Sequence, residues 1–227
     1  MKYRAVIFDL FGTLIDSLSA REHERVVSDM ATVLSAPDDS FARLWIQMYD
    51  ERAVGVLTTR TCIERICSIL GLRPQDGQVA LAARQRLDLI RRALTPRPGA
   101  TETIAQLKAL GYKTGLISDC PEEVAILWQD TPLAPLIDVP IFSCSVGLKK
   151  PDPRIYLLAC ERLGVLPEQC IYIGDGGSRE LSGASQVGMR AMRIRVPEMH
   201  ELDAHRVDAE EWEGETICSL PDLLALV

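Results

Sequence analysis

The chain has 227 residues, of which 47% are hydrophobic and 25% charged, and 25 basic against 32 acidic side chains give a net charge of −7. This balance excludes an intrinsically disordered chain and predicts one main core with a smaller inserted lobe. Neither a basic run for nucleic acid, nor an apolar run of the roughly 20 residues that span a membrane, nor a signal peptide is present, so we expect a cytoplasmic protein without nucleic-acid or membrane partners.

The first predicted element is a short buried strand over residues 3–8, which is apolar and β-branched and ends at Asp9. From about 17 to 95, apolar residues recur at helical spacing, and no strand signal interrupts them. The stretches around Val26–Leu34, Phe41–Tyr49 and Leu81–Leu94 are examples. Several consecutive helices of this kind predict a separate, all-helical lobe.

After Pro96 the pattern alternates between helices and strands. Helices are predicted at about 100–110, from 121, at 153–163 and at 178–188, and strands at 114–117, near 141, at 170–173 and at 191–196. An acidic surface loop at 197–215 and a final strand and helix follow. We therefore predict an α/β fold with a Rossmann-like, doubly wound parallel sheet. Its core domain would comprise residues 1–16 and 96–227, and the inserted helical domain would comprise residues 17–95.

Two segments place polar side chains directly after predicted strands, at the sheet edge where ligands of such folds bind. Asp9 is followed by the turn-forming Gly12 and by Thr13, which would expose a carboxylate with a hydroxyl beside it. Ser118 and Asp119 end the second strand, where a hydroxyl and helix-start amides can hold phosphate oxygens. Taken alone, each segment is also typical of a turn or a helix cap.

Two later segments supply a lysine and two acids. Pro151 and Pro153 keep the backbone out of a helix, which predicts an extended segment that aims the Lys150 ammonium inward, towards a phosphoryl group. Asp175 and Glu180 flank a glycine-rich turn after the strand at 170–173 and can bind a hard cation through oxygen. A surface lysine and an acidic turn without a ligand are the alternatives.

In this order, the four segments resemble the four motifs of the haloacid dehalogenase superfamily, and the helical insertion is similar to its cap domain. The resemblance implies a hydrolase that acts on a small phosphorylated metabolite through an aspartyl-phosphate, with Mg²⁺ as cofactor, as a monomer or homodimer. It implies catalytic roles for Asp9 (the nucleophile), Ser118 and Lys150, substrate binding by Thr13, Ser118, Asp119 and Lys150, and metal binding by Asp9, the main-chain carbonyl of Phe11, Asp175 and Glu180.

The chain departs from the phosphatase pattern at Phe11. Phosphatases of the superfamily usually carry a second Asp there, which protonates the leaving group and later activates water. Phenylalanine cannot transfer a proton, so we expect weaker activity on esters with poor leaving groups, such as alkyl alcohols, than on acyl phosphates or phenolic esters.

An aromatic residue in that position is typical of the dehalogenases of the superfamily, and Lys150 with Tyr156 also resembles their lysine and tyrosine. Dehalogenation of 2-haloacids is therefore the first alternative. Against it, those enzymes work without metal and lack the acidic fourth motif, and Ile46 stands where they have a substrate-binding arginine. The second alternative is a catalytically weak protein that binds a phosphorylated ligand or a partner protein in the same cleft.

Four other residues receive simpler interpretations. Asp16 is predicted to start a helix, with a role as substitute acid/base as the less favoured reading. His23 is predicted to be a solvated helix residue, and Trp45 and Tyr49 are predicted to lie in the core of the helical domain.

Overall fold

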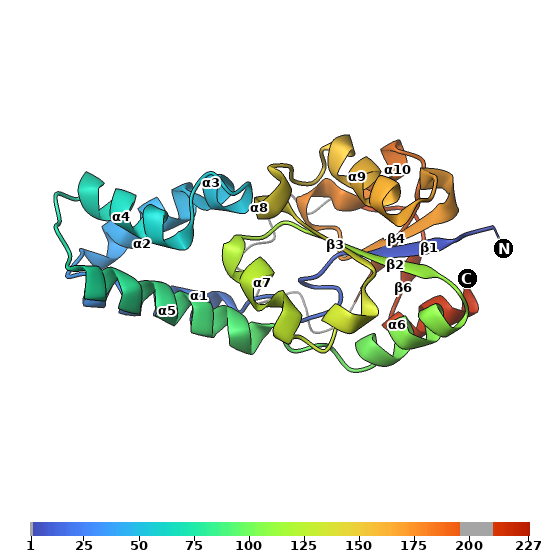
Figure 1. Cartoon of the computed structure of the whole chain (residues 1–227), viewed down its shortest axis with the longest axis horizontal. Helices are drawn as coiled ribbons and strands as arrows, with labels where there is room; N and C mark the ends of the chain where they lie inside the picture. The colour runs from blue at the N-terminus through green and yellow to red at the C-terminus, as the bar shows by residue number, and fades with distance from the viewer. Residues whose placement is uncertain (1, 196–210) are drawn as a thin grey trace.

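A sheet of six parallel strands forms the centre of the molecule (Figure 1). The computed structural model describes residues 2–195 and 211–227. The strands lie in the order β3-β2-β1-β4-β5-β6, with bounds β1 Ala5–Phe8, β2 Lys113–Ser118, β3 Val139–Phe142, β4 Cys170–Gly174, β5 Arg190–Ile194 and β6 Thr216–Ile217. The chain moves outward from β1 to β3 on one side and from β4 to β6 on the other. The strand order therefore reverses between β1 and β4, where open α/β sheets bind ligands.

Helices cover both faces of this sheet, so the predicted doubly wound α/β class is confirmed. Val6 and Phe8 of β1 face a core shared with α6 Ala100–Ala109 and α7 Glu122–Leu127. Ala5 and Ile7 face a second core shared with α9 Pro153–Leu163 and α10 Glu180–Gln186. The strands are buried on both faces, which is why their sequences are apolar runs rather than alternating patterns.

The insertion between β1 and α6 consists of helices, as predicted. They are α1 Ala20–Val33, α2 Asp38–Gln47, α3 Tyr49–Ala53, α4 Thr59–Ile69 and α5 Asp76–Ala93. These helices form a lobe at one end of the sheet and share a hydrophobic core of their own, which we call the cap core (Figure 1). Ile15 bridges to Pro96, so the chain leaves and re-enters the main core at adjacent points. The domain boundaries at 16/17 and 95/96 stay a prediction.

The remaining helices are short. α8 spans Ser143–Val146, and single 3₁₀ turns span Trp128–Asp130, Ala134–Leu136, Pro167–Gln169 and Gly177–Arg179. The predicted final helix is a 3₁₀ helix, Leu220–Ala225. The helix predicted at 178–188 begins only at Glu180, because Ser178 and Arg179 both adopt a left-handed conformation with φ of 52°. Such backbone is rare outside glycine and is found most often where function requires it.

Two sequence expectations need comment. Leu81 was expected on the apolar face of its helix, but it is 50% exposed, because the buried face of α5 is formed by Val79, Ala82, Arg86, Leu89 and Ile90. The acidic loop expected at 197–215 lies largely outside the described residues. Within the described parts of the chain, no helix has the length and apolar character needed to cross a membrane.

Candidate functional site

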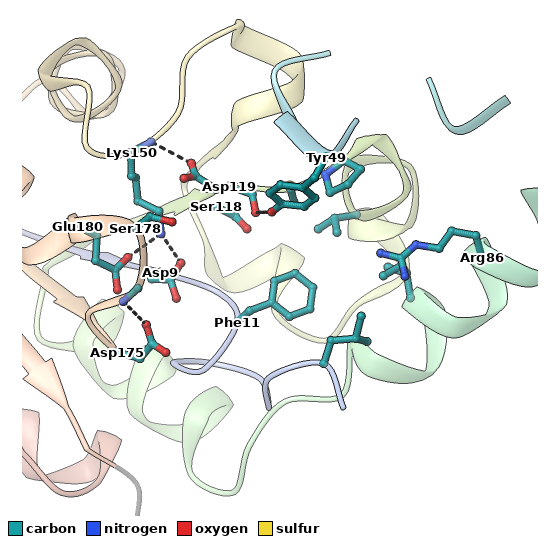
Figure 2. Close-up of a pocket in the computed structure, with 16 residues that line it drawn as sticks. Asp9, Phe11, Tyr49, Arg86, Ser118, Asp119, Lys150, Asp175, Ser178 and Glu180 are labelled. Atoms are coloured by element: carbon teal, nitrogen blue, oxygen red, sulfur yellow. Dashed lines mark hydrogen bonds and ion pairs between the residues drawn. The ribbon is translucent and has the colours of Figure 1, made fainter. Parts of the chain in front are cut away.

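A pocket lies at the carboxyl ends of β1, β2 and β4, between the sheet and the helical lobe (Figure 2). Segments from all four predicted motifs meet in it. Seven of the eight predicted site residues line its wall: Asp9, Phe11, Ser118, Asp119, Lys150, Asp175 and Glu180. Parallel strands bring their carboxyl ends to one edge, which is why residues so far apart in sequence converge here.

Asp9 follows the last residue of β1 and is 5% exposed. Its backbone N–H donates to the carbonyl of Ile173 in β4, which fixes the residue at the switch point of the sheet. The Thr13 hydroxyl donates to Asp9 Oδ2 at 3.1 Å, and Lys150 Nζ donates to Asp9 Oδ1 at 2.6 Å. The eighth predicted residue, Thr13, therefore lies behind Asp9 and orients it, rather than lining the pocket.

Lys150 lies in a turn, not in the extended segment that the flanking prolines predicted. The N–H of Asp152 donates to the carbonyl of Lys149, which closes this turn. The N–H of Lys150 itself donates to Asp119 Oδ1 at 3.0 Å. Asp119 thus holds the backbone of Lys150, and the ammonium still points inward, as predicted, between Asp9 and Glu180.

The two acids after β4 have different surroundings. Asp175 is 5% exposed and accepts the N–H of Gly177 at Oδ1. Glu180 is fully buried and accepts from Lys150 Nζ at 2.6 Å, Tyr172 Oη at 2.8 Å and the N–H of Gly176 at 3.0 Å. Three donors therefore already occupy the Glu180 carboxylate, which makes it the group that positions Lys150.

Two glycines make room for these carboxylates. Gly12 has φ of +79°, and a Cβ there would lie 2.5 Å from Asp175 Oδ2. A Cβ on Gly174 would lie 2.1 Å from Glu180 Oε1, whose position is fixed by its hydrogen bonds. Only glycine permits the close approach of both turns.

The site is rich in buried negative charge. Asp9, Asp175 and Glu180 offer oxygens that all lie within 4.8 Å of one another, and Lys150 is the only cation hydrogen-bonded to them among the described residues. Burial, and then repulsion from Asp175 against the attraction of Lys150, raises the pKa of Asp9 to about 6. Burial and repulsion from Asp9 also raise the pKa of Glu180, and these two carboxylates hold the pKa of Lys150 high despite its burial. Oxygen ligands and uncompensated negative charge fit a hard divalent cation.

Ser118 and Phe11 complete the wall near Asp9. Ser118 is 1% exposed, and its hydroxyl has no hydrogen-bond partner among the described residues, although it lines the pocket. A buried hydroxyl in this state is ready to bind a ligand oxygen. The Phe11 ring also faces the pocket (Figure 2). The side chain of Asp16 is 84% exposed, pairs with Arg97 at 2.7 Å and does not line the pocket, which argues against its role as acid/base.

Sequence reasoning missed three residues of this region. Tyr49 lines the pocket instead of the cap core, and its hydroxyl lies 3.5 Å from the carbonyl of Asp119. Arg86 lines the opposite end of the pocket (Figure 2), and His23, expected in solvent, is buried with Nδ1 3.0 Å from Arg86 Nη1. A charged residue within the apolar stripe of α5 was the available signal for Arg86. No pattern marked Tyr172, the partner of Glu180.

Comparison with known proteins places the chain in a family. A model of haloacid dehalogenase-like hydrolases matches residues 3–188. An (S)-2-haloacid dehalogenase 4A from Burkholderia cepacia is 30% identical over 204 residues, which cover 84% of this chain and 82% of the relative. A glyceraldehyde 3-phosphate phosphatase from Methanopyrus kandleri is 26% identical over 211 residues, with coverage of 90% and 89%.

The fold is also that of solved members. The crystal structure of a haloacid dehalogenase-type phosphatase from Thermococcus onnurineus superimposes with a TM-score of 0.65 at 22% identity, covering 98% of this chain and 97% of that one. The relatives thus include both phosphatases and dehalogenases. On the family match and the shared fold, the chain belongs to the haloacid dehalogenase-like hydrolases.

Proposed function

We propose that this hydrolase is a magnesium-dependent phosphatase that acts on a small phosphorylated metabolite through an aspartyl-phosphate on Asp9. The observation that carries the proposal is the cluster of Asp9, Asp175 and Glu180, whose oxygens lie within 4.8 Å of one another. With a single ammonium between them, these carboxyl groups would repel an anionic substrate unless a cation joined them. A haloacid dehalogenase has no need of such a cluster.

Each residue then has a distinct task. Asp9 and Asp175, with the predicted carbonyl of Phe11, would hold Mg²⁺, which would supply the positive charge that offsets repulsion between Asp9 and the phosphoryl oxygens. Glu180 would act through water, because its oxygens already accept from protein donors. Ser118 and the Lys150 ammonium would hold phosphoryl oxygens, both from fixed positions.

The reaction follows from these positions. One carboxylate oxygen of Asp9 attacks phosphorus, the bond from phosphorus to the leaving oxygen breaks, and the leaving group departs with its electron pair. Water then attacks phosphorus, which releases phosphate and restores the Asp9 carboxylate. Without an acid at position 11, the leaving group takes its proton from solvent.

Phe11→Asp is expected to speed hydrolysis of alkyl phosphates by at least about tenfold, because a positioned acid/base contributes about 10² to 10⁴ in rate. The gain should shrink for aryl and acyl phosphates, whose leaving groups need no proton. The measurement is kcat/KM across esters of graded leaving-group pKa.

Phe11→Asn is the matched control, since it has the same shape as the Asp variant but no proton to transfer at neutral pH. An equal gain in the Asn variant would mean that removal of the ring, not acid catalysis, had raised the rate. Equal rates of the unaltered enzyme on alkyl and aryl esters would also contradict the role assigned to position 11.

Magnesium is expected to raise the melting temperature far more at about pH 7.5 than at about pH 5. The pKa of Asp9 in the folded protein, about 6, lies above its ordinary value of 3.8, so protonation stabilises the folded state at low pH. That contribution is lost as the pH rises through about 6, where the ionised carboxylate becomes available to a cation. Thermal unfolding with and without MgCl₂ at both pH values measures the difference.

The Asp9→Asn variant serves as the control, because the part of the pH effect that belongs to Asp9 should disappear in it. A magnesium-induced shift of the same size at both pH values would contradict metal binding by Asp9.

A substrate panel tests the proposal as a whole. Phosphate esters, acyl phosphates and 2-haloacids would be offered with magnesium and with chelator, and both phosphate and halide would be measured. Chelator-sensitive release of phosphate is the expected result.

Dehalogenation is the second candidate, and the aromatic ring of Phe11 in the pocket favours it. The dehalogenase from Burkholderia cepacia supports the same reading at 30% identity. Halide release that a chelator leaves unchanged would establish this function in place of the first. Silence across the whole panel would favour the third reading, a protein that binds a phosphorylated ligand or a partner without turning it over.

A further inference from the structure

The end of the pocket opposite Asp9 is formed by the helical lobe and contains a buried arginine (Figure 2). Arg86 projects from α5, is 3% exposed and lines the pocket. Phe11 lies between Arg86 and Asp9 in this view, and Leu18, Ile90 and Val124 add apolar wall. The pocket therefore has two polar ends and an apolar middle.

The contacts of Arg86 leave part of its guanidinium free. Nη1 lies 3.0 Å from His23 Nδ1, and Nε lies 3.4 Å from Glu123 Oε1 without forming a hydrogen bond. No described residue pairs with Nη2. A guanidinium has five N–H donors in a planar fork, so an edge remains for a planar acceptor.

The charges around Arg86 do not balance. Arg52 and Arg86 are 2% and 3% exposed, and Glu123, also 3% exposed, is the acid nearest to both. Glu122 lies nearer the surface, where it accepts the N–H of Thr59 at the start of α4. Two buried cations thus share one buried carboxylate, and a second anion would complete the set.

We propose that Arg86 binds a carboxylate on the leaving-group portion of the substrate, so that the enzyme selects short phosphorylated carboxylic acids. This assignment rests on the proposed phosphatase function and names its substrate class. The phosphoryl group would lie at Asp9, a short apolar chain along Phe11, and the carboxylate at the free edge of the guanidinium.

A purely structural role for Arg86 must be separated from this one. Arg86 in the helical lobe and Glu123 in α7 also join the two parts of the molecule, as does the Thr59 hydroxyl, which donates to Glu123 Oε1 at 2.7 Å. Because Arg86→Gln alone would leave Glu123 with less compensation, we pair it with the double variant Arg86→Gln/Glu123→Gln. Thr59→Val is the matched structural control, since it removes a contact to Glu123 but does not line the pocket.

The experiment compares phosphate release from ω-phosphooxy carboxylates with one, two or three methylene groups and from the corresponding neutral amides, all with excess Mg²⁺. The unaltered enzyme should prefer the best carboxylate over its amide by about tenfold to a hundredfold in kcat/KM, through a lower KM. Both Arg86 variants should lose that preference while their activity on the amides stays within about twofold. Thr59→Val should keep it.

The outcomes separate the two proposals. If phosphate is released but the carboxylate preference is absent, or survives in both Arg86 variants, the assignment to Arg86 is wrong and the phosphatase function stands. If no compound of the series yields phosphate although aryl phosphates are hydrolysed, the substrate class is wrong. If no phosphate ester of any kind is hydrolysed, the phosphatase proposal fails and this one with it.

Discussion

Asp9→Asn is expected to reduce kcat by at least about 10³-fold, because the amide cannot form the acyl phosphate on which turnover depends. The melting temperature without metal should stay unchanged or rise. Burial raises the pKa of Asp9 to about 6, so the ionised carboxylate costs stability where it stands. Asparagine removes that charge, and its oxygen still accepts from Lys150 in the position of Oδ1.

Asp16→Asn is the matched control for this variant. The same chemical change is made seven residues away, on a side chain that is 84% exposed and paired only with Arg97. Its activity should remain within about twofold, since surface substitutions usually have small effects. Turnover that persists in Asp9→Asn would reject Asp9 as the nucleophile, and a large loss in Asp16→Asn would restore Asp16 as a candidate acid/base.

The sheet and its polar edge could be predicted because their signals are local. An apolar run that stops at Asp9 and another that stops at Ser118 identify buried parallel strands and mark where each ends. Once the strands are parallel, topology alone brings those ends together, so no long-range information is needed to place Asp9 near Asp175.

The other end of the pocket could not be predicted in the same way. Arg86 and Tyr49 belong to helices whose placement over the sheet depends on packing between lobes, which no short motif encodes. Their sequence neighbourhoods are those of ordinary amphipathic helices, and only the arginine interrupts its apolar stripe. Tyr49 was assigned to the cap core because helical periodicity gives a buried face without saying what covers it.

Side-chain partners were the other gap. Lys150 was expected in extended backbone, but a turn held by the Asp119 carboxylate aims its ammonium instead. Glu180 was expected to bind metal, whereas three protein donors occupy its carboxylate in the structure. One of them, Tyr172, lies within β4, where its apolar neighbours give a tyrosine the appearance of a plain core residue.

Lys150→Met is expected to reduce activity by about 10³-fold and to destabilise the protein by about 3–5 kcal/mol in the presence of chelator at neutral pH. Lys150 Nζ lies 2.6 Å from both Asp9 Oδ1 and Glu180 Oε2, and all three side chains are buried. Without the ammonium, two carboxyl groups with raised pKa values face each other across an apolar side chain. The loss should shrink on acidification, because protonation of either carboxyl relieves the repulsion. Denaturant unfolding at two pH values measures it.

Lys149→Met is the control, since this neighbouring lysine is 42% exposed and pairs with an exposed Asp50, so its loss should cost less than about 1 kcal/mol. The double variant Asp9→Asn/Lys150→Met provides the sharper test. If the destabilisation arises from an unpaired Asp9 carboxylate, removing that carboxylate should recover part of it, and the two effects will not add. Added magnesium should likewise recover part of the stability of Lys150→Met, because a cation would replace the missing charge. Strict additivity, with no recovery by magnesium, would mean that Lys150 acts through packing and that the charge balance proposed for this site is wrong.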